Sequence, residues 1–509
     1  MNTLGLTQHL SSQVRWPLHS VAQTQALEHQ AQTELPANTL MQRAGLATAQ
    51  LAMAIAPHAR TIWIACGPGN NGGDGLEAAA HLQAWGKKPV VTWLGNEAKA
   101  PADTLQAWHR AKAAGVTFVE QPPKEFDLAI DALLGIGAQR APEGLMAQWL
   151  SAIQASKGPV LCVDVPTGLL ADTGEWLDTA QQPHAHAHIS TQRHTLSLLT
   201  LKPGLFTADG QDAAGQVWFN DLGVVSSLTP AAWLQQHGAA STERPHNSHK
   251  GSFGDVSILG GAPGMSGAAM LAGLAALHGG AGRVLLGLMD EAARHAATAT
   301  YPALMVRTPV ELDLTTSTVV CGCGGGDDIH ALLHNVLSSS HKLVLDADAL
   351  NAVARDTSMQ RLLTKRSKHQ KPTVLTPHPL EAARLLNCTT KDVQQNRLLA
   401  AQQLAHTFQC VVVLKGSGSI IAGPEHTAVI NGSGNALLAT AGTGDVLAGL
   451  IGAYIARRDD VFEAACQAVF SHGHMAEAWP NEGPTLDATS LAASVRRSEE
   501  RRVGKECLR

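Results

Sequence analysis

The chain lacks the features that mark several classes of protein. No apolar stretch reaches the roughly 18 residues that a membrane-spanning helix requires, and the N-terminal segment MNTLGLTQHLSSQVRW has no charged region followed by an apolar core, as a signal peptide would. Lysine and arginine (37) do not outnumber aspartate and glutamate (42), so the basic surface of nucleic-acid-binding proteins is missing. We therefore expect a cytoplasmic protein that uses neither a membrane nor a nucleic acid as partner.

Cysteine is also sparse. The 8 cysteines are scattered, and only Cys321 and Cys323 lie close together, which argues against a disulfide framework or a zinc site. What the chain does have is 45% hydrophobic and 16% charged residues over 509 positions, a globular composition too long for one compact domain. Its 48 glycines gather in a few loops, which predicts an enzyme built around glycine-rich turns.

Two blocks of apolar runs alternate with helical patterns, which is typical of parallel α/β sheets. We predict four buried strands in the first block: Thr61–Cys66, Pro89–Leu94, Phe126–Ile130 and Pro159–Val165. Six are predicted in the second: Val256–Gly260, Arg283–Leu288, Thr318–Cys321, Leu343–Asp346, Thr373–Leu375 and Cys410–Leu414. The chain thus divides into an N-terminal domain over 1–225, a linker over 226–249 and a C-terminal domain over 250–492.

Two segments stand apart from this pattern. The charged end of the chain, 493–509, is interpreted as a non-native or disordered tail, because it has dense charge and little apolar periodicity. His184, His186 and His188 alternate in HAHAH, but without a nearby cysteine or carboxylate an exposed loop is favoured over a metal site.

The first glycine loop, Gly67–Gly75, follows a strand and opens a helix. It carries G-x-G-x-x-G, whose glycines let backbone N–H groups approach a phosphate, although the same turn also occurs without a ligand. The side chains of Asn70, Asn71 and Asp74 suit a polar ligand or a hard cation.

Asp131 and Asp164 end two further strands of the same block. Because ligands bind at the carboxyl ends of parallel strands, we expect both to converge with Asn71 and Thr167. Each aspartate also has a purely structural interpretation, as a cap of a helix or turn.

The second block has no G-x-x-x-x-G-K-[ST] phosphate loop. Instead Gly442, Thr443 and Gly444 offer successive N–H groups at the start of the apolar helix Val446–Ile455, which predicts an anion site. Asp445 follows them, either as a base that accepts a hydroxyl proton or as a first-turn residue favoured by the helix dipole.

Three more loops of the second block each have both a functional and a structural interpretation. Lys415–Ser419 offers a cation and hydroxyls to phosphates, or is an ordinary hairpin turn. His378 points from a strand end between two prolines, or is a packed loop histidine. Asp346 and Asp348 either hold Mg²⁺ or cap the following helix.

Together these motifs resemble those of the bifunctional NAD(P)H-hydrate repair enzymes. GPGNNGGDG, DALLGIG and DVPTG are similar to the epimerase domain, which implies a Rossmann-like three-layer α/β fold. GGAPGMSGA, DADALN, TPHP, KGSGS and AGTGDVLAG are similar to the ADP-dependent dehydratase domain, which implies a ribokinase-like α/β fold. The resemblance spans roughly residues 15–490 and implies homo-oligomer formation.

The resemblance implies an enzyme that interconverts the R and S hydrates of NADH or NADPH (NADHX and NADPHX) and dehydrates the S form using ADP. In the epimerase domain, Asn71, Asp131 and Thr167 would coordinate K⁺, and Asp164 would be the acid/base group. The hydrate would lie against Asp164 and two loops, made of Asn70, Asn71, Gly72, Gly73 and Asp74 and of Gly135, Ile136, Gly137, Ala138, Gln139, Arg140 and Ala141.

In the dehydratase domain, which would use Mg²⁺, Asp445 would be the catalytic base. The hydrate would contact Ala268, Gly326, His378 and Asp445, and ADP would contact Lys415, Gly416, Ser417, Gly418, Ser419 and Gly444. Cys323 stands where this family usually has a proline, and Thr167 replaces a common serine while keeping its hydroxyl. The alternative is a ribokinase-like kinase of a vitamin or sugar with a fused nucleotide-binding or interaction domain.

Overall fold

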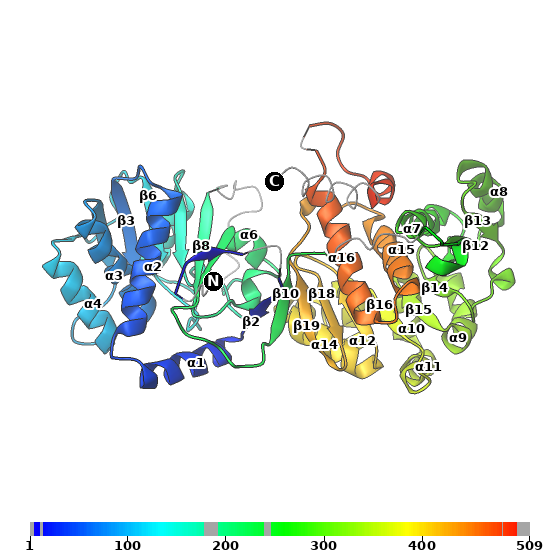
Figure 1. Ribbon diagram of the computed structural model, residues 1–509, viewed down its shortest axis with the longest axis horizontal. Coiled ribbons are helices and arrows are strands. Elements are labelled where there is room, and N and C mark those ends of the chain that lie inside the picture. Colours follow the sequence, from blue (N-terminus) through cyan, green and yellow to red (C-terminus); the bar gives the residue numbers. More distant parts are fainter. Residues whose placement is uncertain (1–4, 11–13, 178–191, 239–245, 481, 496–509) are drawn as a thin grey trace. The chain divides into compact units, whose positions relative to one another are not determined.

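The computed structural model describes residues 5–10, 14–177, 192–238, 246–480 and 482–495 (Figure 1). The chain divides into two compact units, which we call the first unit (Met1–Ser11 and Trp16–Trp233) and the second unit (Ser12–Arg15 and Leu234–Arg509). The histidine run at 184–188 and residues 496–509 of the predicted tail lie outside the described residues, whereas residues 493–495 of that predicted tail are helical and Val495 is buried. Within the described parts of the chain, no helix combines the length and the apolar character needed to cross a membrane.

The first unit is built on an eight-stranded sheet of order β1-β9-β8-β7-β6-β3-β4-β5. All neighbouring strands run parallel except β1, which is antiparallel to β9. The strands are β1 (Gln8–His9), β3 (Thr61–Cys66), β4 (Lys88–Trp93), β5 (Thr117–Phe118), β6 (Leu128–Ala132), β7 (Val160–Val163), β8 (Arg193–Leu198) and β9 (Gln216–Asn220). The helices are α1 (Val21–Glu34), α2 (Thr39–Ile55), α3 (Asn70–Ala84), α4 (Ala102–Ala113), α5 (Leu145–Gln154) and α6 (Gly210–Ala214).

Helices cover both faces of this sheet, so its strands are apolar on both sides. In β3, Ile62 and Ile64 pack in the cluster formed with α2, α3 and α4, whereas Trp63 packs on the opposite face with Trp149 and Ile153 of α5. Because successive side chains of a strand point to opposite faces, a continuous apolar run such as TIWIAC requires two covering layers. Figure 1 shows α2, α3 and α4 in front of the sheet.

The second sheet has eleven strands in the order β13-β12-β11-β14-β15-β16-β17-β18-β19-β10-β2. It is parallel from β13 to β17, and β18 is antiparallel to both of its neighbours, β17 and β19. The strands are β2 (Trp16–Leu18), β10 (Ala232–Gln235), β11 (Asp255–Gly260), β12 (Arg283–Leu288), β13 (Met305–Arg307), β14 (Thr318–Cys321), β15 (Lys342–Leu345), β16 (Thr373–Leu375), β17 (Val411–Leu414), β18 (Ile420–Gly423) and β19 (His426–Asn431).

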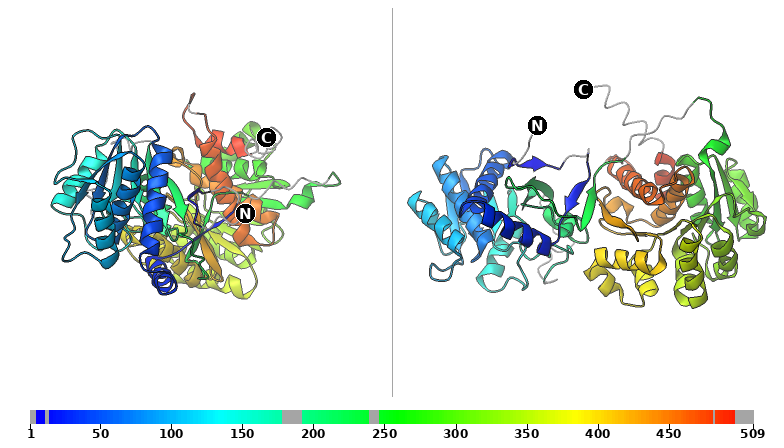
Figure 2. Two further views of the ribbon diagram at one scale, coloured as in Figure 1. Left: turned by 60° about the vertical axis from the view of Figure 1, so that its left-hand side comes forward. Right: turned by 60° about the horizontal axis from the view of Figure 1, so that its bottom comes forward.

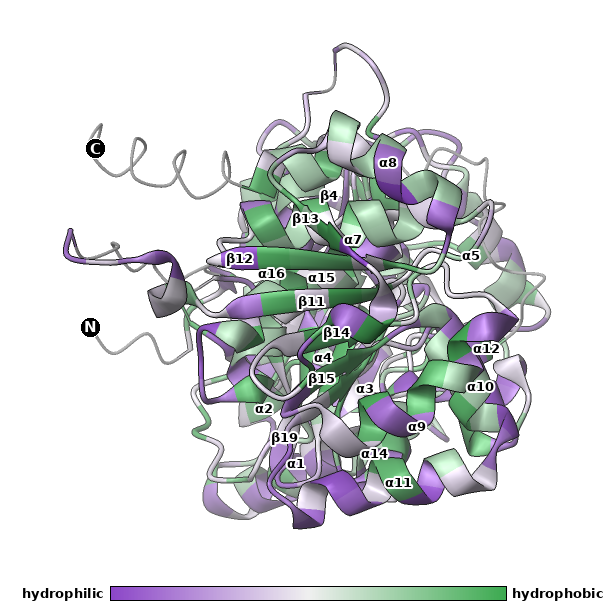
Figure 3. Cartoon of the chain, turned by 90° about the vertical axis from the view of Figure 1, so that its right-hand side faces the viewer, coloured by the Kyte–Doolittle hydropathy of each residue, from purple (hydrophilic) through white to green (hydrophobic). Residues whose placement is uncertain are grey.

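The helices of the second unit again lie on both faces of the sheet. They are α7 (Ser266–His278), α8 (Glu291–Thr300), α9 (His330–Ser339), α10 (Ala347–Arg355), α11 (Thr357–Lys368), α12 (Pro379–Leu386), α13 (Thr390–Gln395), α14 (Arg397–Phe408), α15 (Thr443–Ala456) and α16 (Val461–Glu477). Figure 2, right, shows α15 and α16 in orange and red on one side and α14 in yellow on the other. Figure 3 shows β11 and β12 as hydrophobic over most of their length, as strands covered on both faces must be.

All ten predicted strands are present, with bounds shifted by at most a few residues. Residues of the predicted loops form the first turns of two helices. α15 starts at Thr443, three residues before the predicted Val446, and α3 starts at Asn70, inside the first glycine loop. Part of the predicted linker forms strand β10.

Candidate active sites

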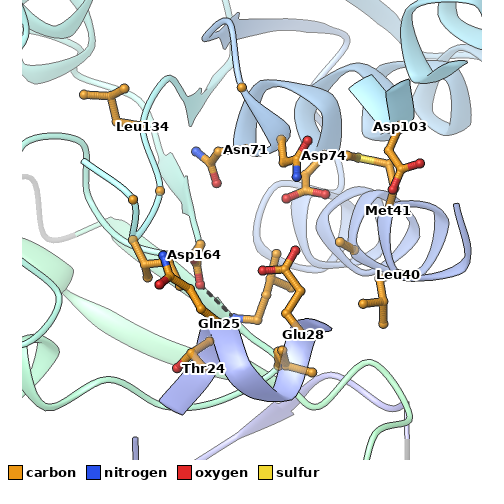
Figure 4. A pocket seen from close by; sticks show the side chains of 18 of the residues that line it. Thr24, Gln25, Glu28, Leu40, Met41, Asn71, Asp74, Asp103, Leu134 and Asp164 are labelled. Carbon is orange, nitrogen blue, oxygen red and sulfur yellow. Dashed lines mark hydrogen bonds between the residues drawn. The ribbon is translucent and has the colours of Figure 1, made fainter. Parts of the chain in front are cut away.

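A cavity of about 470 Å³ opens at the carboxyl ends of β3, β6 and β7 in the first unit. Its lining includes most of the polar residues predicted for this site, namely Asn70, Asn71, Asp74 and Asp164, and the loop residues Gly135, Ile136, Gly137 and Ala138. Helix α1 contributes Thr24, Gln25 and Glu28, and the turn after β8 contributes Lys202. Figure 4 shows Asn71, Asp74, Glu28 and Asp164 around this space.

Asp164 is held in an unusual backbone conformation at the end of β7. Its φ is +68°, a left-handed value that few residues other than glycine adopt. Its backbone N–H donates to Leu196 O at 2.8 Å, and its Oδ1 accepts from the Lys202 amine. Lys202 is fully buried and also donates to Leu198 O at 2.7 Å. The predicted acid/base residue therefore carries a buried ion pair.

Asp131 and Thr167 meet as predicted. The Thr167 hydroxyl donates to Asp131 Oδ1 at 2.6 Å, and the Thr167 N–H donates to Oδ2 at 3.1 Å. Burial raises the pKa of Asp131 despite these hydrogen bonds. Asn71, in the first turn of α3, lies against Gly135, and its buried Nδ2 has no hydrogen-bond partner among the described residues.

Two further carboxyl groups face the same cavity. Burial, together with the nearby charges of Asp164 and Glu28, raises the pKa of Asp74 well above its usual value. Burial and the charge of Asp164 also raise the pKa of Glu28. These two groups therefore favour the protonated, hydrogen-bond-donating form more than ordinary carboxyls do.

Some predicted residues of this site lie elsewhere. Gly72 and Gly73 are buried in α3, where a Cβ on Gly72 would come within 2.0 Å of Gly67 O and one on Gly73 within 2.6 Å of Met41 Cε. Because neither residue has a side chain, the first turn of α3 can pack closely against Gly67 and Met41, which is a structural reason for glycine at both positions. Gln139, Arg140 and Ala141 are not among the residues that line the cavity.

In the second unit, the predicted anion site is the N-terminus of α15. Gly442 caps this helix with φ +90°, a conformation that suits glycine. The Lys415 amine reaches the same place, since it lies 3.5 Å from where a Cβ of Gly444 would stand. A helix N-terminus and a lysine together form a favourable site for phosphate groups.

Lys415 sits between two acidic side chains. Its Nζ lies 2.7 Å from Asp346 Oδ1 and 3.9 Å from Glu381 Oε2. Asp346, which is buried, also accepts from the Thr376 hydroxyl at 2.7 Å. Burial by itself lowers the pKa of Lys415, but the two carboxylates outweigh it and raise that pKa above the usual value. The lysine is therefore charged at neutral pH.

Asp445, in the first turn of α15, has the properties of a base. Burial and the charge of Asp346 raise its pKa to about 6. Cys323, Asp346 and Asp445 each bring one potential ligand atom within 4.8 Å of the others. A carboxylate with this pKa is ionised at neutral pH and accepts a proton more readily than an ordinary aspartate.

The remaining predicted dehydratase residues surround this centre on neighbouring loops. His378 Nδ1 accepts from the N–H groups of Leu380 and Glu381, so the histidine caps α12. The Gly326 N–H donates to Asp348 Oδ2 at 2.8 Å, so Asp348 holds the loop that follows β14 in place. Ala268 Cβ lies 2.9 Å from where a Cβ of Gly324 would stand, so only glycine fits there.

Lys415–Ser419 forms the turn between the antiparallel strands β17 and β18, so the hairpin and the phosphate-binding interpretations describe the same loop. Arg397 stabilises this turn, because its buried guanidinium donates to Lys415 O at 3.2 Å. A Cβ on Gly416 would lie 2.8 Å from the same guanidinium, so glycine leaves room for Arg397 at this position.

Sequence reasoning missed Glu28, Lys202, Glu381 and Arg397. Glu381 could have been found, because His378 and Glu381 have the three-residue spacing of a capping box. The other three carry no local signal, since each reaches its site through the tertiary fold.

Comparison with known proteins gives matches to both halves of the chain. A family model described as NAD(P)H-hydrate dehydratase matches residues 256–497, and one described as YjeF-related protein N-terminus matches residues 37–204. The chain is 35% identical over 460 residues to the bifunctional NAD(P)H-hydrate repair enzyme Nnr of Escherichia coli (strain K12), which covers 86% of this chain and 84% of that protein.

Other relatives have the same kind of description. The corresponding enzyme of Coxiella burnetii is 33% identical over 479 residues, covering 90% of this chain and 94% of its own. The ADP-dependent (S)-NAD(P)H-hydrate dehydratase of Neisseria meningitidis serogroup B is 41% identical over 240 residues, which are 46% of this chain and 80% of that protein. A crystal structure of the ADP/ATP-dependent NAD(P)H-hydrate dehydratase of Bacillus subtilis has a TM-score of 0.46 and 31% identity, and covers 52% of this chain and 95% of that one.

Identity above 30% extends over more than four fifths of both this chain and two of these relatives, and both halves match their own family model. The first unit contains the YjeF-related domain and the second contains the NAD(P)H-hydrate dehydratase domain, each built on an α/β sheet that is mostly parallel. The chain belongs to the family of bifunctional NAD(P)H-hydrate repair enzymes.

Proposed function

We propose that the two sites divide the repair of hydrated NADH and NADPH between them. The cavity around Asp164 interconverts the R and S hydrates, and the site around Asp445 dehydrates the S hydrate at the expense of ADP. The observation that carries this proposal is the position of Asp445 in the first turn of α15, where the Lys415 amine meets the helix N-terminus. A base beside a phosphate-binding site is what a phosphorylation-driven dehydration requires.

The chemistry explains why dehydration would use ADP. Hydroxide is a poor leaving group, so the hydroxyl of the hydrate first attacks the terminal phosphorus of ADP. As this P–O bond forms, the bond from that phosphorus to AMP breaks, and Asp445 accepts the hydroxyl proton. Phosphate then leaves from the ring carbon, and loss of a proton from the neighbouring carbon restores the dihydropyridine. Lys415 and the N–H groups of Gly442–Gly444 would hold the phosphates.

The acidic residues of this site fit a nucleotide-bound Mg²⁺. Mg²⁺ usually takes one or two carboxylates in addition to substrate phosphates. Asp346 Oδ1 is engaged by Lys415 and Thr376, and Oδ2 accepts only a weak hydrogen bond from Cys323 Sγ at 3.9 Å among the described residues. We propose that Asp346 Oδ2 would hold the ion together with the nucleotide phosphates, so that the Asp445 carboxylate stays available to accept the hydroxyl proton.

In the first unit, the residues fit a K⁺ ion. Asp131 is a buried carboxylate whose pKa is raised by burial, and Asn71 Oδ1 lies beside the loop that follows β6, 3.2 Å from where a Cβ of Gly135 would stand. A cation held by Asn71, Asp131 and Thr167 would compensate the buried charge and fix the loops that border the cavity. Asp164 would then accept the hydroxyl proton of the hydrate as the bond between the hydroxyl-bearing carbon and the ring nitrogen breaks, which gives an aldehyde and a protonated ring nitrogen. The nitrogen would attack the other face of the carbonyl to close the ring, and the oxygen would regain a proton, so the hydrate returns with the opposite configuration.

The test uses a mixture of both NADPH hydrate epimers, with and without ADP. Return of dihydronicotinamide absorbance from the whole mixture, and only with ADP, is the expected result. Recovery of the S half alone would contradict the epimerase assignment, and no recovery would contradict the whole proposal. Accumulation of a phosphorylated vitamin or sugar would instead support the kinase alternative, which the match of both units to repair enzymes does not favour.

We further propose that the protein is a cytoplasmic homo-oligomer that acts on the hydrates of both NADH and NADPH. Light scattering measures the oligomeric state, and cell fractionation measures the location. Rates with each hydrate measure the preference between them.

A further inference from the structure

The cavity of the first unit contains a lysine that is completely withdrawn from solvent. Lys202 is 0% exposed, and its Nζ donates to Leu198 O at 2.7 Å, to Ser197 Oγ at 3.4 Å and to Asp164 Oδ1. Lysine is almost never fully buried unless it is paired. Among the described residues that line the cavity, Lys202 is the one cation.

Four carboxyl groups line the same cavity, and they are not equivalent. Asp164 is the carboxylate that bonds directly to Lys202, and its Oδ1 also accepts from Leu198 N at 3.4 Å. Glu28 and Asp74 point toward each other in Figure 4, and the charge of Asp164 disfavours their ionisation. Asp103, at the start of α4, is the fourth.

We infer that Lys202 is a positioning residue of the epimerase site, which engages Asp164 alone among the four carboxyl groups and fixes its direction, and leaves Asp74 and Glu28 as proton donors. This inference rests on the proposed function of the first unit. Lys202 anchors the Leu198–Lys202 turn to Asp164, so the amine holds the carboxylate oxygen at a defined place in the cavity. A base held in a fixed direction beside groups that can donate a proton is the arrangement that acid/base catalysis needs.

His19 lies near Lys202 but does not line the cavity. It is buried, its Nδ1 has no partner among the described residues, and burial and the charge of Lys202 both lower its pKa. The neutral form of this histidine does not compete with Lys202 for the Asp164 carboxylate.

The experiment compares the full-length wild type with Lys202→Gln, which keeps a long hydrogen-bonding side chain without the charge. Epimerisation is measured without ADP at neutral pH, as the change of the R to S ratio of NADPH hydrate with time. Loss of Lys202 should reduce kcat by about 100-fold and leave KM nearly unchanged, because the lysine contacts Asp164 and the Leu198–Lys202 turn. An unchanged kcat would overturn the inference.

Chemical rescue supplies a second readout. Lys202→Ala leaves space beside Asp164 for a small alkylamine, so added ethylamine should restore part of the epimerisation, whereas ethanol at the same concentration should not. Equal recovery with both, or none with ethylamine, would contradict the inference.

A third variant, Asp164→Asn, keeps both the Lys202 side chain and the shape of residue 164. It therefore tests the same pair even if the lysine variants do not fold. It should lose epimerisation to the same extent as Lys202→Gln and show no amine rescue. Full epimerisation by Asp164→Asn would overturn the inference, whereas absence of epimerisation in the wild type would overturn the proposed function itself.

Discussion

The amine of Lys415 lies 2.7 Å from Asp346 Oδ1, and Asp346 is 69 residues away in the chain. Lys415 ends β17 and Asp346 ends β15, and β16 lies between these strands in the sheet. The pair therefore joins two strand ends across the site where Asp445 and the N-terminus of α15 meet. A phosphate-binding lysine that is already oriented by a buried carboxylate loses little side-chain freedom when the nucleotide binds.

Substitution Lys415→Met should weaken both the fold and the binding of ADP. It leaves the Asp346 carboxylate buried without its cation, and removal of one partner of a buried ion pair costs about 3–5 kcal/mol. Denaturant unfolding measures the stability, and calorimetric titration measures ADP affinity. The matched control is Arg355→Met, whose ion pair with Asp327 is exposed on both sides and should contribute little. Equal effects of the two substitutions would contradict the role of the buried pair.

Asp445→Asn should abolish dehydration while leaving nucleotide binding intact. The amide keeps the size of the side chain but cannot accept the hydroxyl proton, so the ADP-dependent rate should fall by about 100- to 10,000-fold. Asp164→Asn, in the other unit, is the control and should spare dehydration of the S hydrate. Undiminished recovery of the dihydronicotinamide absorbance by Asp445→Asn would exclude Asp445 as the base.

The dehydration rate should depend on pH through Asp445. Burial raises the pKa of this carboxyl to about 6, and a base works only when it is unprotonated. The value of kcat/KM for the S hydrate should therefore be constant at neutral pH and fall as the pH decreases through about 6. Substitution of Asp346, whose charge contributes to the raised pKa, by asparagine should move this limb to lower pH. A limb near the ordinary aspartate value of about 4 would contradict the assignment.

Thr167→Val should destabilise the first unit. The Thr167 hydroxyl is fully buried, donates to Asp131 Oδ1 at 2.6 Å and accepts from Leu134 N at 3.1 Å. Valine removes both hydrogen bonds, which leaves Asp131 Oδ1 with the longer bond from Leu133 N at 3.3 Å and takes the acceptor from the Leu134 N–H. The expected loss is about 1–3 kcal/mol. Thr48→Val is the control, because the equally buried Thr48 hydroxyl bonds only to Ala44 O within its own helix. Thermal unfolding of both variants tests whether the two losses differ.

The strands and the loops that follow them could be predicted because their signals are local. Apolar runs such as Thr61–Cys66 and Arg283–Leu288 were found with their observed bounds. The helix starts were less predictable. The NNGGD residues read as a loop, but Gly72 and Gly73 allow such close packing that the first turn of α3 begins at Asn70.

The partners of the site residues could not be predicted in the same way. Asp164 and Asp445 were identified from their positions after a strand and at a helix start. Lys202 lies 38 residues from Asp164, and Glu28 reaches the cavity from α1, which precedes every strand around it. Neither residue stands in a glycine loop or a recognisable motif.

The sequence by itself determined the strand–loop–helix units, the family and the side chains that end each strand, because apolar periodicity and glycine turns act over a few residues. The tertiary structure alone decided which charges meet, namely Lys202 with Asp164 and Lys415 with Asp346. The physical reason is that strand order within a sheet, and not separation along the chain, brings these groups together out of water. Burial there changes the pKa values of Asp74 and Asp445, and with them the chemistry that the residues can perform.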